Sequence, residues 1–358
     1  MDVAAFRSEF PVLERLAFLN AGSDGPVPRR GAEAATARIE RELADGRAGR
    51  PHFDGLVELA GALRSRFAQL LGCDPADVAL TRSATDGMAT VFAALDLGPG
   101  DEVLASDQEH PGLLAPLEGA RRRHGFDVRF APFGELPSEI GPRTRLVACS
   151  HVSWVGGRMV DARALAESEA LVLLDGAQGL GAVPVDVAAL GCDFYAAAGQ
   201  KWLCGPDGSG CLYVRRGVSD GLDPPWPSYM SLAEPGRPSE LIPHPGARRF
   251  DLAASGPLGA WMLASVELFQ DAGLDWVHER GTALAERLAT TLRERGIDVS
   301  PRDRTTLVSW RADDPEGTVA RLAHAGVIVR FLPGRGLVRA SVGAWSNEED
   351  LDRLLAAL

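Results

Sequence analysis

Short apolar segments alternate with amphipathic, helix-like stretches from about residue 60 to residue 215. This alternation is typical of an α/β fold, in which helices cover both faces of a mostly parallel sheet. We predict seven strands, at residues 78–80, 102–105, 128–131, 145–150, 171–174, 194–197 and 210–214. Ligands of open α/β sheets collect beyond the carboxyl ends of the strands. Polar residues that directly follow these strands are therefore the first candidates for a functional site.

The rest of the chain has a different pattern. Seven prolines between residues 223 and 246 are incompatible with regular structure, so we predict a long loop there. A long helix should follow at 258–272, and the tail then predicts a small α+β unit with strands at 306–311, 327–332 and 336–341. We expect three parts: an N-terminal segment (1–20), a large domain (21–255) and a small C-terminal domain (256–358).

Composition narrows the class of protein. A formal net charge of −12 argues against nucleic acid or an anionic membrane surface as a partner. No apolar run reaches the length of a membrane span, and the first residues do not resemble a signal peptide. The five cysteines are scattered and contain no CxxC pair, which predicts neither a disulfide framework nor a metal site. We therefore expect a cytoplasmic protein.

Lys201 is the only lysine among 37 lysines and arginines. Arginine can supply surface charge, ion pairs and carboxylate binding, but it does not lose its proton near neutral pH to attack a carbonyl. A composition poor in lysine could leave one by chance. The flanking segment GQKWLCGPDGSG favours a chemical role for this amine.

A carboxylate stands at a matching position. Asp175 ends a buried-looking strand, Gln178 follows three residues later, and Lys201 comes 26 residues after Asp175. Taken alone, Asp175 could be a helix cap. Together with a lysine, however, it provides what pyridoxal phosphate (PLP) needs: an amine for the imine and a carboxylate that keeps the pyridine nitrogen protonated. The sequence therefore predicts PLP as the cofactor.

Two further segments could complete such a site. In TRSATDGMATVFAAL a strand turns into a helix, and backbone amides with Thr85 could bind a phosphate, although Ser and Thr cap helices in many proteins. His110 follows another strand and precedes Pro111. It is either a structural histidine, or a residue that lies over a flat cofactor or acts as an acid or base.

Three segments carry a family resemblance: DGAQGLGAVPVDV, DFYAAAGQKWLCGPDGSGCLYV and VRASVGAWSNEEDLDRL. They resemble the class V aminotransferase family of fold type I PLP-dependent enzymes, and the similarity extends from FLNAGSDGPVP at 18–28 to the last helix. The family includes cysteine desulfurases, cysteine and cystine C–S lyases, kynureninase and isopenicillin N epimerase-like proteins. The resemblance implies a mostly parallel seven-stranded sheet in a large domain, a small C-terminal α+β domain and a homodimer with shared active sites.

The resemblance also implies roles for individual residues. Lys201 matches the Schiff-base lysine, Asp175 the partner of the pyridine nitrogen, and Gln178 the partner of the ring oxygen. The remaining matches are the residue stacked on the ring (His110), a residue near the ring (Trp154), phosphate-binding positions (Ala84, Thr85, Gln200), a contribution across the dimer (Ser255) and the arginine that binds the substrate α-carboxylate (Arg339).

Departures from the family pattern bear on the reaction. Desulfurases carry a nucleophilic cysteine in a loop between the last two strands, whereas this chain runs through Pro333-Gly334 without one. Trp154 stands where desulfurases have an asparagine, which favours the epimerase-like and C–S lyase branch, and Ala198 replaces a usual phosphate-binding serine. We therefore expect β-elimination from a cysteine derivative. A class V aminotransferase, an amino-acid epimerase and a catalytically silent PLP-binding protein are the alternatives.

Overall fold

The computed structural model describes residues 2–252 and 255–358. Its largest sheet has the strand order β2-β8-β7-β6-β5-β3-β4, built from Val78–Thr81 (β2), Glu102–Ser106 (β3), Asp127–Ala131 (β4), Thr144–Ser150 (β5), Leu171–Asp175 (β6), Phe194–Ala198 (β7) and Gly210–Val214 (β8). Strand β8 is antiparallel to both of its neighbours, and the other strand pairs are parallel. The prediction of a mostly parallel seven-stranded sheet is confirmed.

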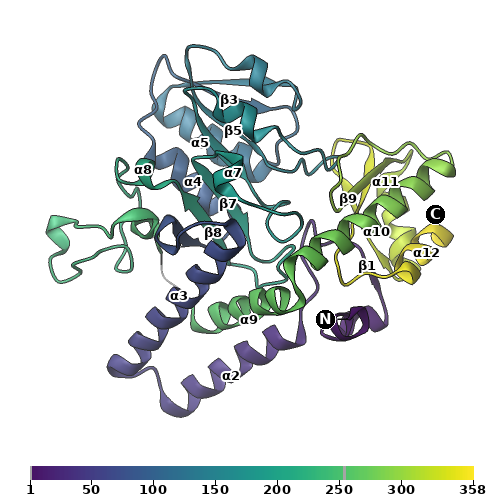
Figure 1. The fold of residues 1–358 in the computed structure, drawn as a ribbon, viewed down its shortest axis with the longest axis horizontal. Coiled ribbons are helices and arrows are strands. Elements are labelled where there is room, and N and C mark those ends of the chain that lie inside the picture. The colour runs from purple at the N-terminus through teal and green to yellow at the C-terminus, as the bar shows by residue number, and fades with distance from the viewer. Residues whose placement is uncertain (1, 253–254) are drawn as a thin grey trace.

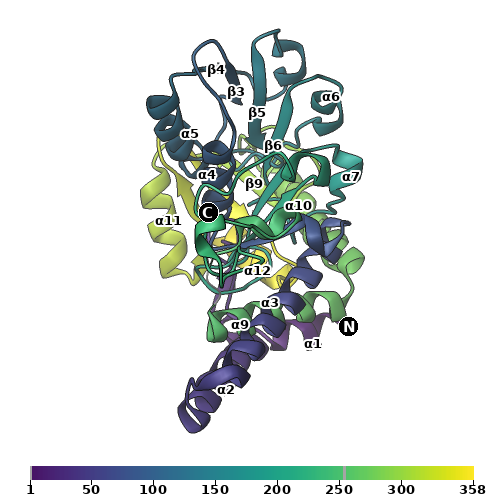
Figure 2. The same cartoon turned by 90° about the vertical axis from the view of Figure 1, so that its left-hand side faces the viewer.

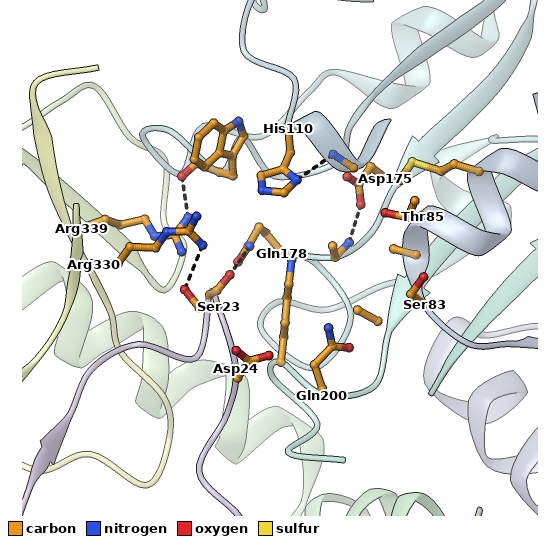
Figure 3. A pocket seen from close by; sticks show the side chains of 18 residues that line it. Ser23, Asp24, Ser83, Thr85, His110, Asp175, Gln178, Gln200, Arg330 and Arg339 are labelled. Carbon is orange, nitrogen blue, oxygen red and sulfur yellow. Dashed lines mark hydrogen bonds between the residues drawn. The ribbon is translucent and has the colours of Figure 1, made fainter. Parts of the chain in front are cut away.

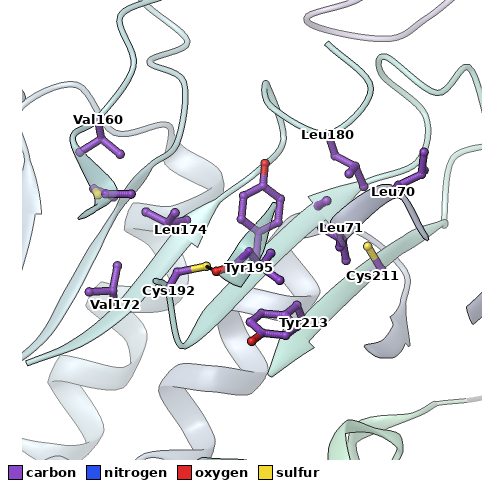
Figure 4. Close-up of a cluster of buried hydrophobic side chains, with 14 of the residues drawn as sticks. Leu70, Leu71, Val160, Val172, Leu174, Leu180, Cys192, Tyr195, Cys211 and Tyr213 are labelled. Carbon is purple, nitrogen blue, oxygen red and sulfur yellow. Dashed lines mark hydrogen bonds between the residues drawn. The ribbon is translucent and has the colours of Figure 1, made fainter. Parts of the chain in front are cut away.

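Side chains of this sheet alternate between two hydrophobic cores. In β6, Val172 and Leu174 belong to one core and Leu173 to the other, as the two-residue period of a strand requires. The first core, part of which Figure 4 shows, packs under α3 (Gly49–Leu71), α6 (Ala162–Ala166), α7 (Val187–Leu190) and α9 (Gly256–Ala272). The second packs under α4 (Ala84–Ala94) and α5 (Pro111–His124). Helices therefore cover both faces of the sheet.

The C-terminal part forms a smaller α+β unit beside the large sheet (Figure 1). Its antiparallel sheet has the order β11-β12-β9, with β9 at Leu307–Arg311, β11 at Arg330–Leu332 and β12 at Leu337–Ser341. Its helices are α10 (Leu274–Glu294), α11 (Pro315–His324) and α12 (Glu348–Ala357). Two of the three strands predicted from the tail of the sequence, at 306–311 and 336–341, are present as expected.

One predicted strand is divided in two. Residues 327–332 were expected to be continuous, but Val327–Ile328 (β10) pairs in parallel with Ala17–Phe18 (β1), whereas Arg330–Leu332 pairs with β12. The split arises because the N-terminal segment takes the first half of this stretch as its partner. The N-terminus is thereby tied to the C-terminal unit, and the ion pair between Arg7 of α1 (Val3–Ser8) and Asp350 adds to this attachment.

Helix α9 connects the two units. Its Met262 and Val266 belong to the core beneath the large sheet, while Phe269 packs in the cluster with the N-terminal Phe6. Because one helix contributes to both regions, the boundary placed between residues 255 and 256 stays a prediction.

Helices α2 (Arg29–Asp45) and α3 form an arm that leaves the body of the molecule alongside α9 (Figures 1 and 2). The close contact of α2 with α9 needs Gly31, because a Cβ there would lie 2.4 Å from Cδ1 of Trp261. After the short helix α8 (Arg216–Ser219), the predicted proline-rich loop contains the 3₁₀ turn Pro238–Glu240 and an isolated antiparallel bridge between Leu232 and Pro243. The loop leaves Trp226 and Tyr229 exposed. Among the described residues, no helix is long and apolar enough to span a membrane.

Candidate active site

Four of the predicted strand-end positions converge on one cavity of about 230 Å³, between the carboxyl edge of the large sheet and the small antiparallel sheet (Figure 3). Among its lining residues are nearly all of the predicted site residues: Ala84, Thr85, His110, Trp154, Asp175, Gln178, Gln200, Lys201 and Arg339. Residues separated by up to 255 positions in the sequence thus line one cavity, and those from the large sheet lie at the carboxyl ends of its strands, as predicted.

Asp175 and Gln178 are held by the turn that follows β6. One carboxylate oxygen of Asp175 accepts the N–H of Ala177 at 2.9 Å, and the side chain is 6% exposed. Burial raises the pKa of Asp175, while the nearby positive charge of Lys201 lowers it. Gln178 donates from Nε2 to the carbonyl of Gly22 at 2.8 Å and accepts the Trp202 indole N–H at 3.1 Å. Its second amide hydrogen is left for another acceptor.

Lys201 follows β7 in a tight turn and lines the cavity. Burial lowers the pKa of its amine to about 8, and the positive charges of Arg339 and Arg330 act in the same direction. The carboxylates of Asp175 and Asp24 oppose this shift. The amine is therefore poised to exchange a proton near neutral pH, which an exposed lysine cannot do.

His110 lies at the upper edge of the cavity in Figure 3, and Trp154 also lines this cavity. His110 precedes α5, and its Nδ1 accepts the N–H of Gly112 at 3.0 Å, so the ring proton lies on Nε2. Its ring lies 4.9 Å from that of Trp154 at an angle of 90°. Burial and nearby cations lower the pKa of His110 to about 4, which keeps the imidazole neutral at pH 7.

The end of the cavity away from Arg330 and Arg339 in Figure 3 has the features of an anion site. Ser83 caps α4, with its hydroxyl accepting the N–H of Asp86, and Ala84 and Thr85 form the first residues of that helix. The amide N–H groups and the dipole of a helix N-terminus favour a phosphate group. Gln200 lies at the same end, and its Oε1 is buried without a hydrogen-bond partner among the described residues. Ala198 lines the cavity where the family usually has a serine.

Arg339 on β12 is fully buried at the substrate end. Its Nη1 donates to the carbonyl of Trp154 at 2.8 Å, whereas Nε and Nη2 have no partner in the described part of the chain. These two nitrogens form the edge of the guanidinium that binds a carboxylate through two parallel hydrogen bonds. Burial and Arg330 lower the pKa of Arg339 to about 9, so the group remains charged at pH 7.

Three polar residues at the cavity mouth were not predicted from the sequence: Ser23, Asp24 and Arg330. Arg330 stands directly opposite Arg339 in the β11–β12 pair, and its Nη1 donates to the Ser23 hydroxyl at 3.1 Å. Two signals could have indicated them. One is the cross-strand position of a second arginine. The other is the pair of glycines, Gly22 and Gly25, on either side of Ser23-Asp24.

Ser255 is the one predicted site residue outside this cavity. It precedes α9 and lines a separate, smaller cavity of about 60 Å³ with Thr81, Arg82 and Gly208. Its predicted contribution to the neighbouring subunit's site therefore stays a prediction.

No cysteine lines the main cavity among the described residues. Strands β11 and β12 are joined by a tight turn through Pro333 and Gly334, so there is no extended loop to carry a nucleophilic thiol. Cys204 lies beyond the lysine turn but is buried, and burial raises the pKa of its thiol well above the usual value. A buried thiol of this kind is a poor nucleophile.

The sequence profile of the family Aminotransferase class-V matches residues 49–354, and the chain belongs to this family. An isopenicillin N epimerase from Streptomyces clavuligerus is 29% identical over 95% of this chain and 93% of its own length. A probable cysteine desulfurase from Pseudomonas aeruginosa is 33% identical over 83% of this chain and 81% of its own. The solved cystine C–S lyase C-DES, in complex with its product cysteine persulfide, has a TM-score of 0.90 at 28% identity and covers 97% of this chain and 98% of its own.

The predictions of family, of fold class, and of a PLP-dependent enzyme with C–S lyase and epimerase relatives are confirmed. The residues present also fit the cofactor. A helix N-terminus at one end suits its phosphate, a buried carboxylate suits its pyridine nitrogen, and an amine with a lowered pKa suits its aldehyde. The individual roles of these residues remain proposals.

Proposed function

We propose that this enzyme cleaves the Cβ–S bond of an S-substituted cysteine by β-elimination. One observation carries the proposal. The cavity combines the poised amine of Lys201, the buried carboxylate of Asp175 and the unpaired edge of Arg339, but no thiol lines it in the described part of the chain. Elimination needs a base, an electron sink and a group that binds the substrate carboxylate. Unlike desulfuration through a persulfide, it needs no protein nucleophile.

Bound PLP withdraws electrons from the substrate Cα and so makes loss of the Cα proton and of a β-substituent possible. The residues of the chain supply the rest. Lys201, neutral in a large fraction of molecules near its pKa of about 8, moves the Cα proton. Arg339 binds the α-carboxylate and fixes which substrate bond faces this amine. Asp175 carries the buried negative charge that keeps a ring nitrogen protonated.

His110 has a positioning role in this proposal. Its lowered pKa of about 4 makes the ring neutral at pH 7, so it is not the general acid. Its Nδ1 is occupied by the Gly112 N–H, which fixes the plane of the ring at the edge of the cavity. A flat neutral ring fixed in this way can stack on a flat cofactor.

Epimerisation is the second candidate, because the epimerase from Streptomyces clavuligerus aligns with 95% of this chain. The two reactions differ in the fate of the deprotonated substrate. Elimination releases a thiol and, after hydrolysis, pyruvate and ammonia, whereas epimerisation returns the amino acid with inverted Cα. Incubation with S-propyl-L-cysteine tests both: pyruvate supports elimination. Inverted substrate without pyruvate, or a keto acid that needs an amino acceptor, rejects it.

The attachment of the cofactor is tested separately. Borohydride reduction followed by peptide mapping should place the pyridoxyl label on Lys201. A protein that carries no such chromophore, or a label on another residue, would contradict the proposal. A chromophore that no amino acid alters would favour a catalytically silent PLP-binding protein.

We also propose a homodimer with shared active sites, working in the cytoplasm. The arm and the proline-rich loop leave Leu43, Trp226 and Tyr229 exposed, at 84%, 49% and 61%, a pattern that favours burial against a second copy.

The five cysteines are unpaired, which suits a reducing compartment such as the cytoplasm. Sedimentation at micromolar concentration should give twice the mass of one chain. Lys201→Ala and Ser255→Ala proteins can also be mixed so that they form mixed dimers. Activity above the average of the two separate proteins would support a role of Ser255 across the interface, and activity equal to that average would contradict it.

A further inference from the structure

Next to the turn that carries Asp175 lies a buried pair of polar side chains that the proposed chemistry does not use. The hydroxyl of Tyr195, on β7, lies 3.0 Å from Nδ1 of His151, the residue that follows β5. The two residues are 0% and 1% exposed, and Tyr195 belongs to the apolar core drawn in Figure 4. Neither of them lines the active-site cavity. The pair is therefore separated from the reacting groups by the turn itself.

The turn after β6, residues 176–180, folds closely around this pair. A Cβ at Gly176 would overlap the ring of Tyr195. A Cβ at Gly179 would overlap the Tyr195 hydroxyl and lie 2.7 Å from Nδ1 of His151. Neither glycine has a positive φ, so the space that Tyr195 and His151 occupy is what excludes a side chain at these positions. The backbone of the turn therefore packs directly against the Tyr195–His151 pair.

The same turn sets the direction of the Asp175 carboxylate. The Ala177 N–H donates to one oxygen of Asp175 at 2.9 Å and so determines where the other oxygen points. The backbone N–H of His151 donates to the Asp175 carbonyl, also at 2.9 Å, and the Gly176 N–H donates to a carbonyl of β7 at 2.7 Å. A displacement of Tyr195 or His151 would thus be passed on to the carboxylate through the backbone of the turn.

This pair contributes less to stability than its burial suggests. Nε2 of His151 is buried without a hydrogen-bond partner among the described residues, and an unsatisfied buried polar atom destabilises a fold. Burial lowers the pKa of His151 to about 4 and raises the pKa of Tyr195 well above its usual value, so both groups are neutral at pH 7. Apolar side chains would fill the same space without this cost. A buried hydrogen bond, however, fixes one geometry.

We propose that Tyr195 is a positioning residue for the reaction: the hydrogen bond between its hydroxyl and His151 holds the turn so that the Asp175 carboxylate keeps its direction into the cavity. The inference rests on the proposed function, in which Asp175 keeps a ring nitrogen of the cofactor protonated. It goes beyond that function by assigning a role to two residues that do not line the cavity.

Tyr195→Phe removes one hydroxyl and keeps the ring. We expect kcat for S-propyl-L-cysteine to fall about tenfold with KM nearly unchanged, since the groups that bind the substrate are not altered. Tyr213→Phe is the matched control, because Tyr213 stands directly opposite Tyr195 in the β7–β8 pair and belongs to the same core. Its hydroxyl makes no hydrogen bond in the described part of the chain, so kcat should stay within about twofold of wild type.

A double-mutant cycle tests whether the effect acts through Asp175. In an Asp175→Asn background, Tyr195→Phe should cause no further loss of kcat, because the charge that it positions is already absent. Independent losses that multiply would contradict the inference.

The double variant Tyr195→Phe/His151→Leu separates geometry from stability. It leaves neither partner of the buried hydrogen bond behind, so its free energy of unfolding should be close to that of the wild type. Its kcat should nevertheless remain about tenfold lower, because the turn has lost the bond that fixes it. A kcat that returned to the wild-type value together with stability would reduce the pair to a packing role and would contradict the inference.

Hydrogen exchange measures the turn itself, without activity or cofactor. In the intact chain freed of cofactor, the peptide that covers residues 175–180 should exchange about tenfold faster in Tyr195→Phe than in the wild type, since the turn opens more often. Tyr213→Phe should leave this exchange unchanged. Equal exchange in Tyr195→Phe and the wild type would overturn the inference, whichever reaction the enzyme catalyses.

The two proposals can fail separately. Faster exchange in Tyr195→Phe, in a protein that forms no pyruvate, would overturn the proposed function and leave the contact of Tyr195 with the turn in place. Pyruvate formation by the wild type, with Tyr195→Phe equal to Tyr213→Phe in kcat and in exchange, would support the proposed function and overturn the inference. Faster exchange together with a loss of kcat that disappears in the Asp175→Asn background supports the inference.

Discussion

The two sides of the cavity are built differently. On the sheet side, Asp175 ends β6 and Lys201 follows the adjacent strand β7, and Ala84 begins the helix after another strand of the same sheet. At the mouth, Ser23-Asp24 comes from the N-terminal segment and Arg330 from the small sheet, and their contact joins residues 307 positions apart. The sheet side therefore has fixed geometry for chemistry at Cα, while the mouth depends on how separate parts of the chain assemble.

This difference suggests a division of labour. Changes on the sheet side should lower the rate for every substrate, because all substrates use the same bond-making groups. Changes at the mouth should alter which substrate is preferred and should act through KM. The following variants test the division, beginning with the largest expected effect.

Replacement of Lys201 by alanine should reduce pyruvate formation about 10⁴-fold for all S-substituted cysteines, since the base is lost. Lys201→Arg is the matched control for charge, and it should be equally inactive because a guanidinium does not release its proton at neutral pH. Steady-state assays with lactate dehydrogenase as the coupling enzyme measure both. Activity within tenfold of wild type would show that another group moves the Cα proton.

Asp175→Asn should lower kcat about 10²- to 10³-fold, by the same factor for every substrate, because a buried charge that stabilises the reacting state is removed. The side chain keeps its size, and its oxygen can still accept the Ala177 N–H. A pH titration of the cofactor absorbance should also show a changed ring protonation. A loss confined to one substrate would show that Asp175 acts in substrate recognition, and it would contradict the proposed division of roles between the sheet side and the mouth.

Gly22→Ala perturbs the mouth side. The new Cβ would meet Arg339 Nη2 at 2.6 Å and the Ser341 hydroxyl at 2.7 Å, so the guanidinium must shift. We expect KM to rise about tenfold with kcat changed less, since misplacement of a substrate-binding group weakens binding first. Gly61→Ala in α3 is the control, because a Cβ there meets nothing within 4 Å. Equal KM values for the two variants would contradict this close contact.

Glu109 lies on the sheet side, and it tests how a buried carboxyl there makes the stability of the fold depend on pH. It is 2% exposed, and it accepts hydrogen bonds from the hydroxyls of Ser106 and, at 2.6 Å, Ser150, at the ends of β3 and β5. Burial raises its pKa from 4.5 to about 7. The folded protein therefore binds more protons than the unfolded chain between these values, and stability falls as pH rises through this window.

Glu109→Gln removes that titration. Between pH 4.5 and pH 8, the free energy of unfolding of the wild type should fall by about 3 kcal/mol relative to the variant, an upper value for a shift of this size. Urea unfolding at the two pH values measures it. Parallel pH dependences of the two proteins would show that Glu109 titrates normally in the fold.

The same contrast explains what the sequence could predict. Asp175 and Lys201 were predictable because a strand followed by a polar residue is a local pattern, and parallel strands bring their ends to one edge. Arg330, Ser23 and Asp24 were not, since their proximity depends on the pairing of the N-terminal segment with β10 and of β11 with β12. Pairing partners of this kind are not encoded in the periodicity of either segment.

The division of residues 327–332 has the same origin. Its apolar pattern is continuous. Strand β10 is separate from β11 only because Val327–Ile328 pairs with β1 while β11 pairs with β12. Arg339 was identified through a family resemblance, whereas its unpaired edge, formed by Nε and Nη2, is a property of packing. Sequence therefore indicated the chemistry of the site more completely than its selectivity.

The single lysine makes the protein a convenient object for chemical labelling. With one side-chain amine in 358 residues, an amine-selective acylating reagent has only that amine and the α-amino group of the chain to react with. Since the amine lies inside the cavity, a second acyl group should be taken up only by molecules whose interior has opened. Mass spectrometry of intact chains would then count open molecules directly, without an engineered probe.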